Sequence, residues 1–178
     1  MSELWRLERL NTGERTALKR AAGTLALNVS ALRAFYKADI CREPHWENQR
    51  YAVMCMACLW NEQDAQPVLS MQDCLKRMCW KDNEFQEAMA RRVDALLETR
   101  WDEDDYLAGK LLNLVRMIRA EGIFRPDFEK LALDLKRWNY ESRVVQREWL
   151  WTIYGNRFDE KEATENAETE EEDNTHDA

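Results

Sequence analysis

The chain has 178 residues, a mass of 21.2 kDa and a formal charge of −8, from 26 basic and 34 acidic side chains. Taken whole, this charge argues against a nucleic-acid-binding domain, because such domains usually carry a basic excess. An apolar content of 45% with eight Trp can fill one core, whereas five Gly and three Pro provide little turn chemistry for an all-β fold. We therefore predict an all-α fold, a single compact helical bundle of about seven to eight helices with no strand.

The negative charge is concentrated at the C-terminus. Residues 159–178 contain ten acidic residues and one lysine, which leaves 25 basic and 24 acidic side chains in residues 1–158. The same segment has too little apolar surface to offset the entropy cost of ordering it. We predict a folded helical domain over residues 1–158, nearly neutral in charge, followed by a disordered acidic tail over residues 159–178.

A capping box and a glycine delimit the first helix. Asn11 stands three residues before Glu14, a spacing that satisfies free amides at a helix start, and Gly23 suits a helix end. The predicted span is Thr12 to Ala22.

Two further helices follow. Val29 to Ala38 has the pattern of an amphipathic helix. Pro44 suits the first turn of a third helix, which contains ten consecutive apolar residues from Tyr51 to Trp60. This segment is apolar all round and too short to span a bilayer, so we predict that it is the central helix of the core.

The middle of the chain predicts two more helices. Ser70 can cap a short one that runs through Met78. Asn83 with Gln86 has the spacing of another helix start. The buried positions expected on that helix are Phe85, Met89, Val93 and Leu96.

The acidic run Asp102, Glu103, Asp104 and Asp105 is expected to begin the next helix, where carboxylates cap free amides and favour the positive end of the helix dipole. Such a cluster could also hold a divalent ion, but adjacent helical positions point in different directions, so capping is favoured. The helix should run to Ala120 and stop at Gly122.

Two helices complete the predicted domain. Pro126 should open one that runs to about Trp138. Ser142 should cap the last one, which ends near Tyr154 before Gly155.

Four of the five cysteines are spaced as two pairs, Cys55 with Cys58 and Cys74 with Cys79, and superficially resemble a four-thiolate zinc site. The first pair lies inside an apolar helix rather than on a turn, which favours buried core thiols, although the sequence leaves zinc binding open. With no secretory signal in MSELWRLERL, we expect a soluble cytoplasmic protein without structural disulfides.

Catalytic patterns are missing from the sequence. His45 is the only histidine outside the tail, and no nucleophile motif accompanies it. The scattered glycines form no phosphate-binding loop. We therefore expect no enzymatic activity and no cofactor.

Basic residues are weighted toward both ends of the predicted domain. Residues 1–50 have nine basic and six acidic groups, residues 106–158 have ten and six, and residues 51–105 have six and twelve. If the terminal helices pack together, they form a basic face on which pairs such as Arg143 and Arg147, four residues apart, could track a phosphate backbone. The alternative is a set of ordinary solvated charges.

Several segments, taken in order, resemble the CasB family, the small subunits of the type I-E CRISPR surveillance complex Cascade. They are LKRAAG, AFYKADICREPHWENQRYAVMCMACLW, NLVRMIRAEG, RPDFEKLALDLKRW and SRVVQREWLWTIYG, and the resemblance covers roughly residues 4–157. It implies an all-α fold without catalytic activity. It also implies two copies per complex, in contact with the backbone subunits and the large subunit, that help to hold the R-loop of guide RNA, target DNA and displaced strand.

Matching the family's basic surface residues position by position gives one set of candidates: Lys19, Arg20, Arg50, Arg92, Arg116 and Arg143. Helix-face geometry adds a second set: Lys110, Arg119 and Arg147. Surface ion pairs are the alternative for each. Trp46 and Trp138 could stack on bases, but core packing is favoured. The acidic tail is not part of the family's common core and could compete for the basic face or aid solubility. A purely structural bridging subunit is the alternative function.

Overall fold

The computed structural model describes residues 4–60, 65–82, 84–102 and 104–155. Within these ranges the chain forms eight α-helices, so the predicted all-α fold is confirmed. The helices are α1 Thr12–Ala21, α2 Val29–Ala38, α3 Glu47–Ala57, α4 Met71–Cys79, α5 Glu87–Glu98, α6 Tyr106–Glu121, α7 Phe128–Lys136 and α8 Val144–Leu150. The predicted acidic tail lies outside the described residues.

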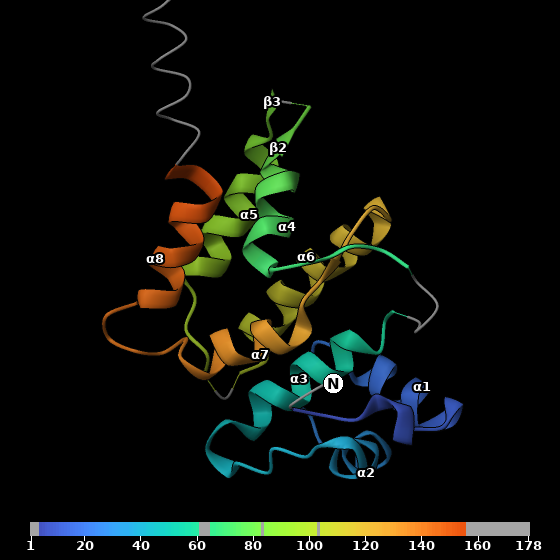
Figure 1. Cartoon of the computed structure of the whole chain (residues 1–178). Coiled ribbons are helices and arrows are strands. Elements are labelled where there is room, and N and C mark those ends of the chain that lie inside the picture. Colours follow the sequence, from blue (N-terminus) through green and yellow to red (C-terminus); the bar gives the residue numbers. More distant parts are fainter. Residues whose placement is uncertain (1–3, 61–64, 83, 103, 156–178) are drawn as a thin grey trace, which may run out of the picture.

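Two groups of helices are joined by a central pair. Helices α1, α2 and α3 pack together at one end of the molecule, and α4, α5 and α8 lie at the other (Figure 1). Helix α6 contacts α5, α4 and α3, while α7 contacts α3 and α4, so these two helices connect the groups. No helix in the described ranges is long and apolar enough to cross a membrane.

Several helix ends follow from the residues that the sequence places there. Asn11 and Glu14 form the complete capping box of α1, with the Glu14 backbone amide 2.9 Å from Asn11 Oδ1. Ser70 caps α4, and Gly122 ends α6 in the left-handed conformation that glycine adopts without a Cβ penalty. These predictions are confirmed.

The core is centred on α3, as the apolar run predicted. Every residue from Arg50 to Ala57 is buried in this helix, and a turn continues the buried run to Trp60. Trp138 packs against Trp149 with ring centroids 5.3 Å apart. Trp46 and Trp138 are only 2% and 1% exposed, so both belong to the core and neither presents a stacking surface.

The expectation that there is no strand is wrong, because four two-residue strands form in the described residues. Val68–Leu69 (β1) pairs in parallel with Arg125–Pro126 (β4), and Trp80–Lys81 (β2) pairs antiparallel with Glu84–Phe85 (β3). Phe85 is therefore outside α5 and 41% exposed, where its ring stacks on Trp80 with centroids 4.8 Å apart.

Three predicted helix starts are also wrong in detail. Pro126 is taken up by β4, and Asp127 caps α7 instead. Arg143 in a left-handed conformation precedes α8, without a cap from Ser142. Asp105 stands at the start of α6 but its carboxylate accepts from Thr24 Oγ1 at 2.6 Å and from the backbone amide of Leu25 at 2.5 Å. A contact with a distant loop thus replaces the expected helix cap; Glu103 and Asn83 lie outside the described residues.

Candidate nucleic-acid interface

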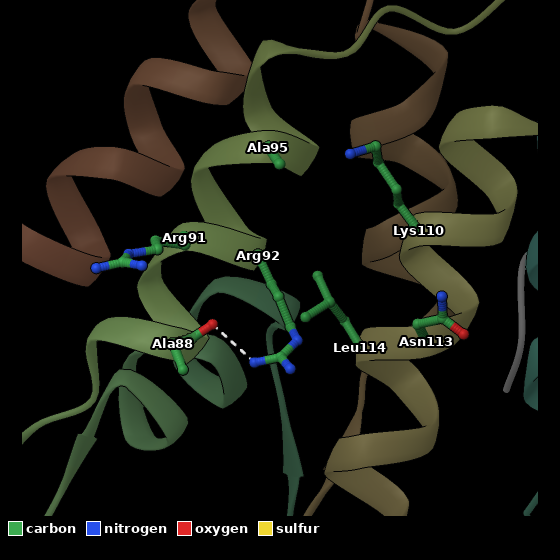
Figure 2. A pocket seen from close by; sticks show the side chains of 7 residues that line it. All are labelled: Ala88, Arg91, Arg92, Ala95, Lys110, Asn113 and Leu114. Atoms are coloured by element: carbon green, nitrogen blue, oxygen red, sulfur yellow. Dashed lines mark hydrogen bonds between the residues drawn. The ribbon is translucent and has the colours of Figure 1, made fainter.

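A groove between α5 and α6 brings together two of the predicted basic residues, Arg92 and Lys110. Its volume is about 460 Å³, and Figure 2 shows its walls. The residues that line this α5–α6 groove are Ala88, Arg91, Arg92, Ala95, Lys110, Asn113 and Leu114. None of these lining residues is acidic.

Helical periodicity explains why these side chains face the groove. On α5, Met89, Val93 and Leu96 turn inward to the core, which leaves the intervening arginines outside. Leu114 forms an apolar part of the wall on α6, and Ala95 is too small to fill the space opposite it. The groove is therefore an apolar trough bordered by cations whose stems pack along it.

Arg92 and Lys110 extend toward the groove from opposite walls (Figure 2). Arg92 Nη1 donates to the backbone oxygen of Ala88 at 2.7 Å, which holds its guanidinium in place. Lys110 Nζ lies 4.6 Å from the centroid of the Tyr106 ring, a cation–π contact. Among the described residues, no carboxylate pairs with either cation, so both charges are available to an anion.

Arg91 is a third cation of the groove that sequence reasoning missed. Its guanidinium points toward the α8 side in Figure 2 and lies 2.9 Å from Glu87. Both side chains are more than 70% exposed, so this ion pair contributes little and can be exchanged for another anion. The two consecutive arginines in ARRVDALLETR could have indicated this residue. Adjacent residues of a helix point in different directions, so the two arginines place charge on both edges of the exposed face of α5.

A second groove, between α5 and α8, contains Arg143 and Arg147 but is mixed in charge. Asp94 and Glu98 line the same groove, which has a volume of about 310 Å³. Arg143 Nη2 donates to the backbone oxygen of Leu97, and this contact fastens the start of α8 to the end of α5. The pair is thus brought together as predicted, but within a field that the two carboxylates weaken.

The remaining predicted cations do not converge on the α5–α6 groove. Arg116 and Arg119 are exposed on α6, but Arg119 follows Lys110 by nine residues, which at 3.6 residues per turn places it on the opposite side of the helix. Arg20 is exposed on α1, whereas Lys19 is half-buried. The positive charge of Lys19 acts to lower the pKa of the Cys58 thiol, which burial raises. The predicted basic residues therefore occupy several faces rather than one.

Arg50 was expected on the basic face, and this expectation is wrong. Its side chain is 0% exposed and forms a two-pronged ion pair with Asp39: Nε lies 3.1 Å from Oδ1, and Nη2 lies 2.9 Å from Oδ2. Nη1 also donates to the backbone oxygen of Glu43 at 2.6 Å, and the guanidinium lies 4.7 Å from the centroid of the Trp46 ring. Arg50 thus joins α3 to the end of α2.

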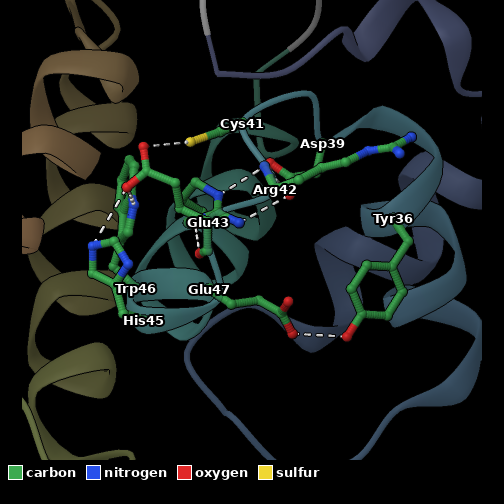
Figure 3. Close-up of polar contacts among 9 residues, drawn as sticks. Tyr36, Asp39, Cys41, Arg42, Glu43, His45, Trp46 and Glu47 are labelled. Carbon is green, nitrogen blue, oxygen red and sulfur yellow. Dashed lines mark hydrogen bonds and ion pairs between the residues drawn. The ribbon is translucent and has the colours of Figure 1, made fainter.

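The polar surroundings of that ion pair complete a structural cluster, drawn in Figure 3. Glu43 accepts from Lys136 Nζ at 2.8 Å and from Trp46 Nε1 at 2.9 Å, and these two hydrogen bonds lower the pKa of Glu43 to about 2. Lys136 also lies over the Trp46 ring, 4.8 Å from its centroid. Trp46 thereby contacts two cations, which helps to hold the connection between α2 and α3.

The two cysteine pairs lie in the core, as the favoured interpretation predicted. Burial raises the pKa of Cys55 and Cys74 to about 12 and that of Cys58 and Cys79 to about 11. Buried, protonated thiols of this kind pack as small apolar side chains. No group of three or more His, Cys, Asp or Glu side chains in the described part of the chain is arranged to hold a metal ion.

Comparison with known proteins places this fold. Residues 14–154 match the family model of CRISPR-associated protein Cse2. A structure titled "CRISPR RNA-guided surveillance complex" is similar with a TM-score of 0.66 at 20% identity, over 86% of this chain and 88% of that one. A second, titled "CRISPR RNA-guided surveillance complex, pre-nicking", has a TM-score of 0.67 at 18% identity, over 86% and 89%.

A third similar structure is titled "Crystal structure of M. ruber CasB", with a TM-score of 0.65 at 16% identity, over 88% of this chain and 92% of that one. At these identities the structures show the fold alone, and no curated protein gave a match. The family match spans most of the chain and confirms the resemblance inferred from its segments. The chain therefore belongs to the CRISPR-associated Cse2 family.

Proposed function

We propose that this chain is a non-catalytic subunit of a CRISPR RNA-guided surveillance complex and that it contacts the nucleic-acid backbone through the α5–α6 groove. The observation that carries the proposal is the placement of Arg92 and Lys110 on opposite walls of a groove whose lining contains no carboxylate. The titles of two structures with the same fold, which name such a complex, support the assembly.

Two or three cations are enough for a useful contribution. Formation of a guide RNA–target DNA heteroduplex nearly balances the loss of the DNA duplex, so a few protein–backbone contacts can tip the equilibrium. Cations that contact phosphates act on any sequence, because they release condensed counterions without reading base edges. The apolar wall at Leu114 and Ala95 would accommodate sugar or base surface of a displaced single strand.

The other exposed cations would extend this contact along the complex. Arg116, Arg119 and Arg20 face solvent on α6 and α1, and Arg147 does so on α8. In the proposed complex they would meet other stretches of guide RNA, target DNA or displaced strand. The neighbouring backbone subunits, the large subunit and a second copy of this chain would be the protein partners.

Salt-dependent binding tests the direct contact. The full chain would be titrated with a single-stranded and a duplex oligonucleotide at several salt concentrations, beside a variant carrying Arg92→Gln and Lys110→Gln. We expect the variant to lose affinity and to have a salt slope shallower by about 1 for each lost phosphate contact. A matched control carries Arg33→Gln and Lys37→Gln, which remove two cations from α2. Equal salt slopes for all three proteins would refute the groove as the contact.

Bridging between protein subunits is a second candidate function, favoured by exposed apolar side chains near the C-terminal end of the fold. Leu150 and Trp151 are 40% and 64% exposed, and Tyr140, which precedes α8, is 54% exposed. Charge reversal at Arg92 and Arg116 distinguishes the two functions. Loss of assembly would indicate a bridging contact, whereas an intact complex with a weakened R-loop would indicate contact with nucleic acid.

A further inference from the structure

We infer that the acidic segment 159–178 of this chain binds the α5–α6 groove and competes there with nucleic acid. The inference rests on the proposed function only in taking nucleic acid as the competing ligand. Its first support is charge complementarity: the segment carries ten carboxylates and one lysine. Arg92 and Lys110 face the groove, Arg91 lies at its α8 edge, and no carboxylate lines it.

The point at which the described chain ends is fixed next to helix α5. Tyr154 Oη donates to Asp94 Oδ1 on α5 at 3.1 Å, and the backbone oxygen of Ile153 accepts from Trp80 Nε1 at 3.0 Å. Asp94 follows Arg91 by three residues, a spacing that puts both on the same side of the helix. The described chain thus ends next to the side of α5 that carries Asp94 and Arg91.

The chain beyond Gly155 is long enough to reach the α5–α6 groove. The first acidic residue, Asp159, is four residues beyond Gly155 and can reach about 13 Å from it in an extended chain. Packed helices lie about 8–10 Å apart, so a few more residues cross α5 to Arg92 and Lys110. Arg91, on the α8 side of α5 in Figure 2, lies on this route.

The nearer alternative, the α5–α8 groove, is a poorer match for an acidic segment. It contains Arg143 and Arg147, but Asp94 and Glu98 line it as well, and one Arg143 nitrogen is already bonded to the backbone of α5. Two carboxylates among two cations leave little net attraction for a polyanion. The α5–α6 groove is therefore the site that the segment should prefer.

The size of the effect follows from effective concentration. A short tether holds its ligand at roughly millimolar local concentration. If the groove binds a polyanion with a dissociation constant on the order of 0.1 mM, the weak end of the range for non-specific nucleic-acid binding, the segment reduces affinity for nucleic acid about tenfold. Salt should remove both the docking and the competition.

Zero-length carbodiimide coupling in the dilute full-length protein tests docking directly. It joins a carboxylate to a lysine amine only on contact, so peptide mass spectrometry should find the segment coupled to Lys110 at low salt and not at high salt. Lys37 and Lys130 serve as lysines outside the groove. Coupling spread evenly over these lysines, no coupling at all, or coupling between isotopically distinct copies would overturn the inference.

A binding measurement tests competition separately. Replacing the ten tail acids by Asn or Gln should tighten binding of an oligothymidine about tenfold at low salt. In the Arg92→Gln, Lys110→Gln background the same replacement should increase the affinity less, because only the general repulsion between the tail and the oligothymidine is removed. Equal gains in both backgrounds would overturn the inference. Coupling to Lys110 in a protein that binds no oligonucleotide would uphold docking and refute the proposed function instead.

Discussion

Replacing Arg50 by methionine removes the guanidinium that pairs with Asp39 inside the fold, and we expect this change to destabilise the protein rather than to weaken nucleic-acid binding. The two side chains are 0% and 3% exposed, so Asp39 would keep a charge with neither water nor its partner. The Glu43 backbone oxygen would lose its 2.6 Å hydrogen bond as well. Removing one partner of such a pair costs about 3–5 kcal/mol of unfolding free energy.

Urea unfolding followed by far-UV circular dichroism measures this loss. In thermal unfolding of a domain of this size, the same loss of about 3–5 kcal/mol corresponds to a fall in Tm of roughly 6–20 °C. Arg116→Met is the matched control, because Arg116 is exposed, and should change stability by no more than about 0.5 kcal/mol. Combining Arg50→Met with Asp39→Leu should restore part of the loss, since no buried charge is then left unpaired.

The opposite pattern would refute this reasoning. If Arg50→Met unfolds at the same urea concentration as the parent but binds nucleic acid less tightly, then Arg50 acts at a binding surface, as its sequence position first suggested. A double variant less stable than Arg50→Met alone would contradict the role of the unpaired Asp39.

Further expectations concern the glycines and the thiols. Gly23→Ala should lower the free energy of unfolding by roughly 2–5 kcal/mol, because its Cβ would lie 2.4 Å from Leu112 Cδ2 at a φ of +86°. Gly122→Ala, with a φ of +71° and no neighbour within 4 Å, should cost about 1–2 kcal/mol. Urea unfolding measures both, and equal costs would contradict the packing at Gly23. In the folded protein iodoacetamide should modify half-buried Cys41 first and the four buried thiols only after unfolding, as peptide mass spectrometry would show; uniform labelling would contradict their burial. Burial raises the pKa of those four thiols from about 9 to about 11–12, so the folded state retains protons that the unfolded state loses. Their contribution to stability should be complete below pH 9 and fall above it, and a Cys55→Ala variant should show a smaller alkaline loss in unfolding measurements; identical pH profiles would contradict this.

Local signals in the sequence predicted the helices and placed several of their ends within a few residues. Val29–Ala38 is α2 as predicted, and the capping residues Asn11 and Ser70 act within a few residues of the positions that they define. Such signals work because a cap and the amides that it satisfies are close in sequence. The central place of α3 follows from its apolar run in the same way.

The errors arise where a distant partner takes over a residue. Asp105 was assigned to a helix cap, but it accepts hydrogen bonds from Thr24 and Leu25, about eighty residues away in the chain. Pro126 was assigned to a helix start, but β4 pairs with β1 across a separation that no local pattern encodes. Phe85 fitted the apolar spacing of α5, yet it pairs with Trp80 in a strand.

The candidate interface shows the same division. Sequence identified Arg92 and Lys110 one at a time, but only the packing of α5 against α6 makes them face each other across a groove. Arg50 was misplaced because a buried arginine and an exposed one look alike in sequence until the acceptor, here Asp39, is known. Arg119 was grouped with Lys110 from spacing, although nine residues along one helix separate their directions by half a turn.

Target-DNA binding by the assembled surveillance complex, measured between 50 and 200 mM salt, tests the proposed contact most directly. The complex would contain either the parent chain or the Arg92→Gln, Lys110→Gln variant, with the Arg33→Gln, Lys37→Gln variant as the charge-matched control. Two lost phosphate contacts on a single strand predict that, for each copy of the groove variant, the loss of affinity over this range is about sevenfold smaller than for the parent. Identical salt dependence of the parent and groove-variant complexes, with intact assembly, would contradict the account.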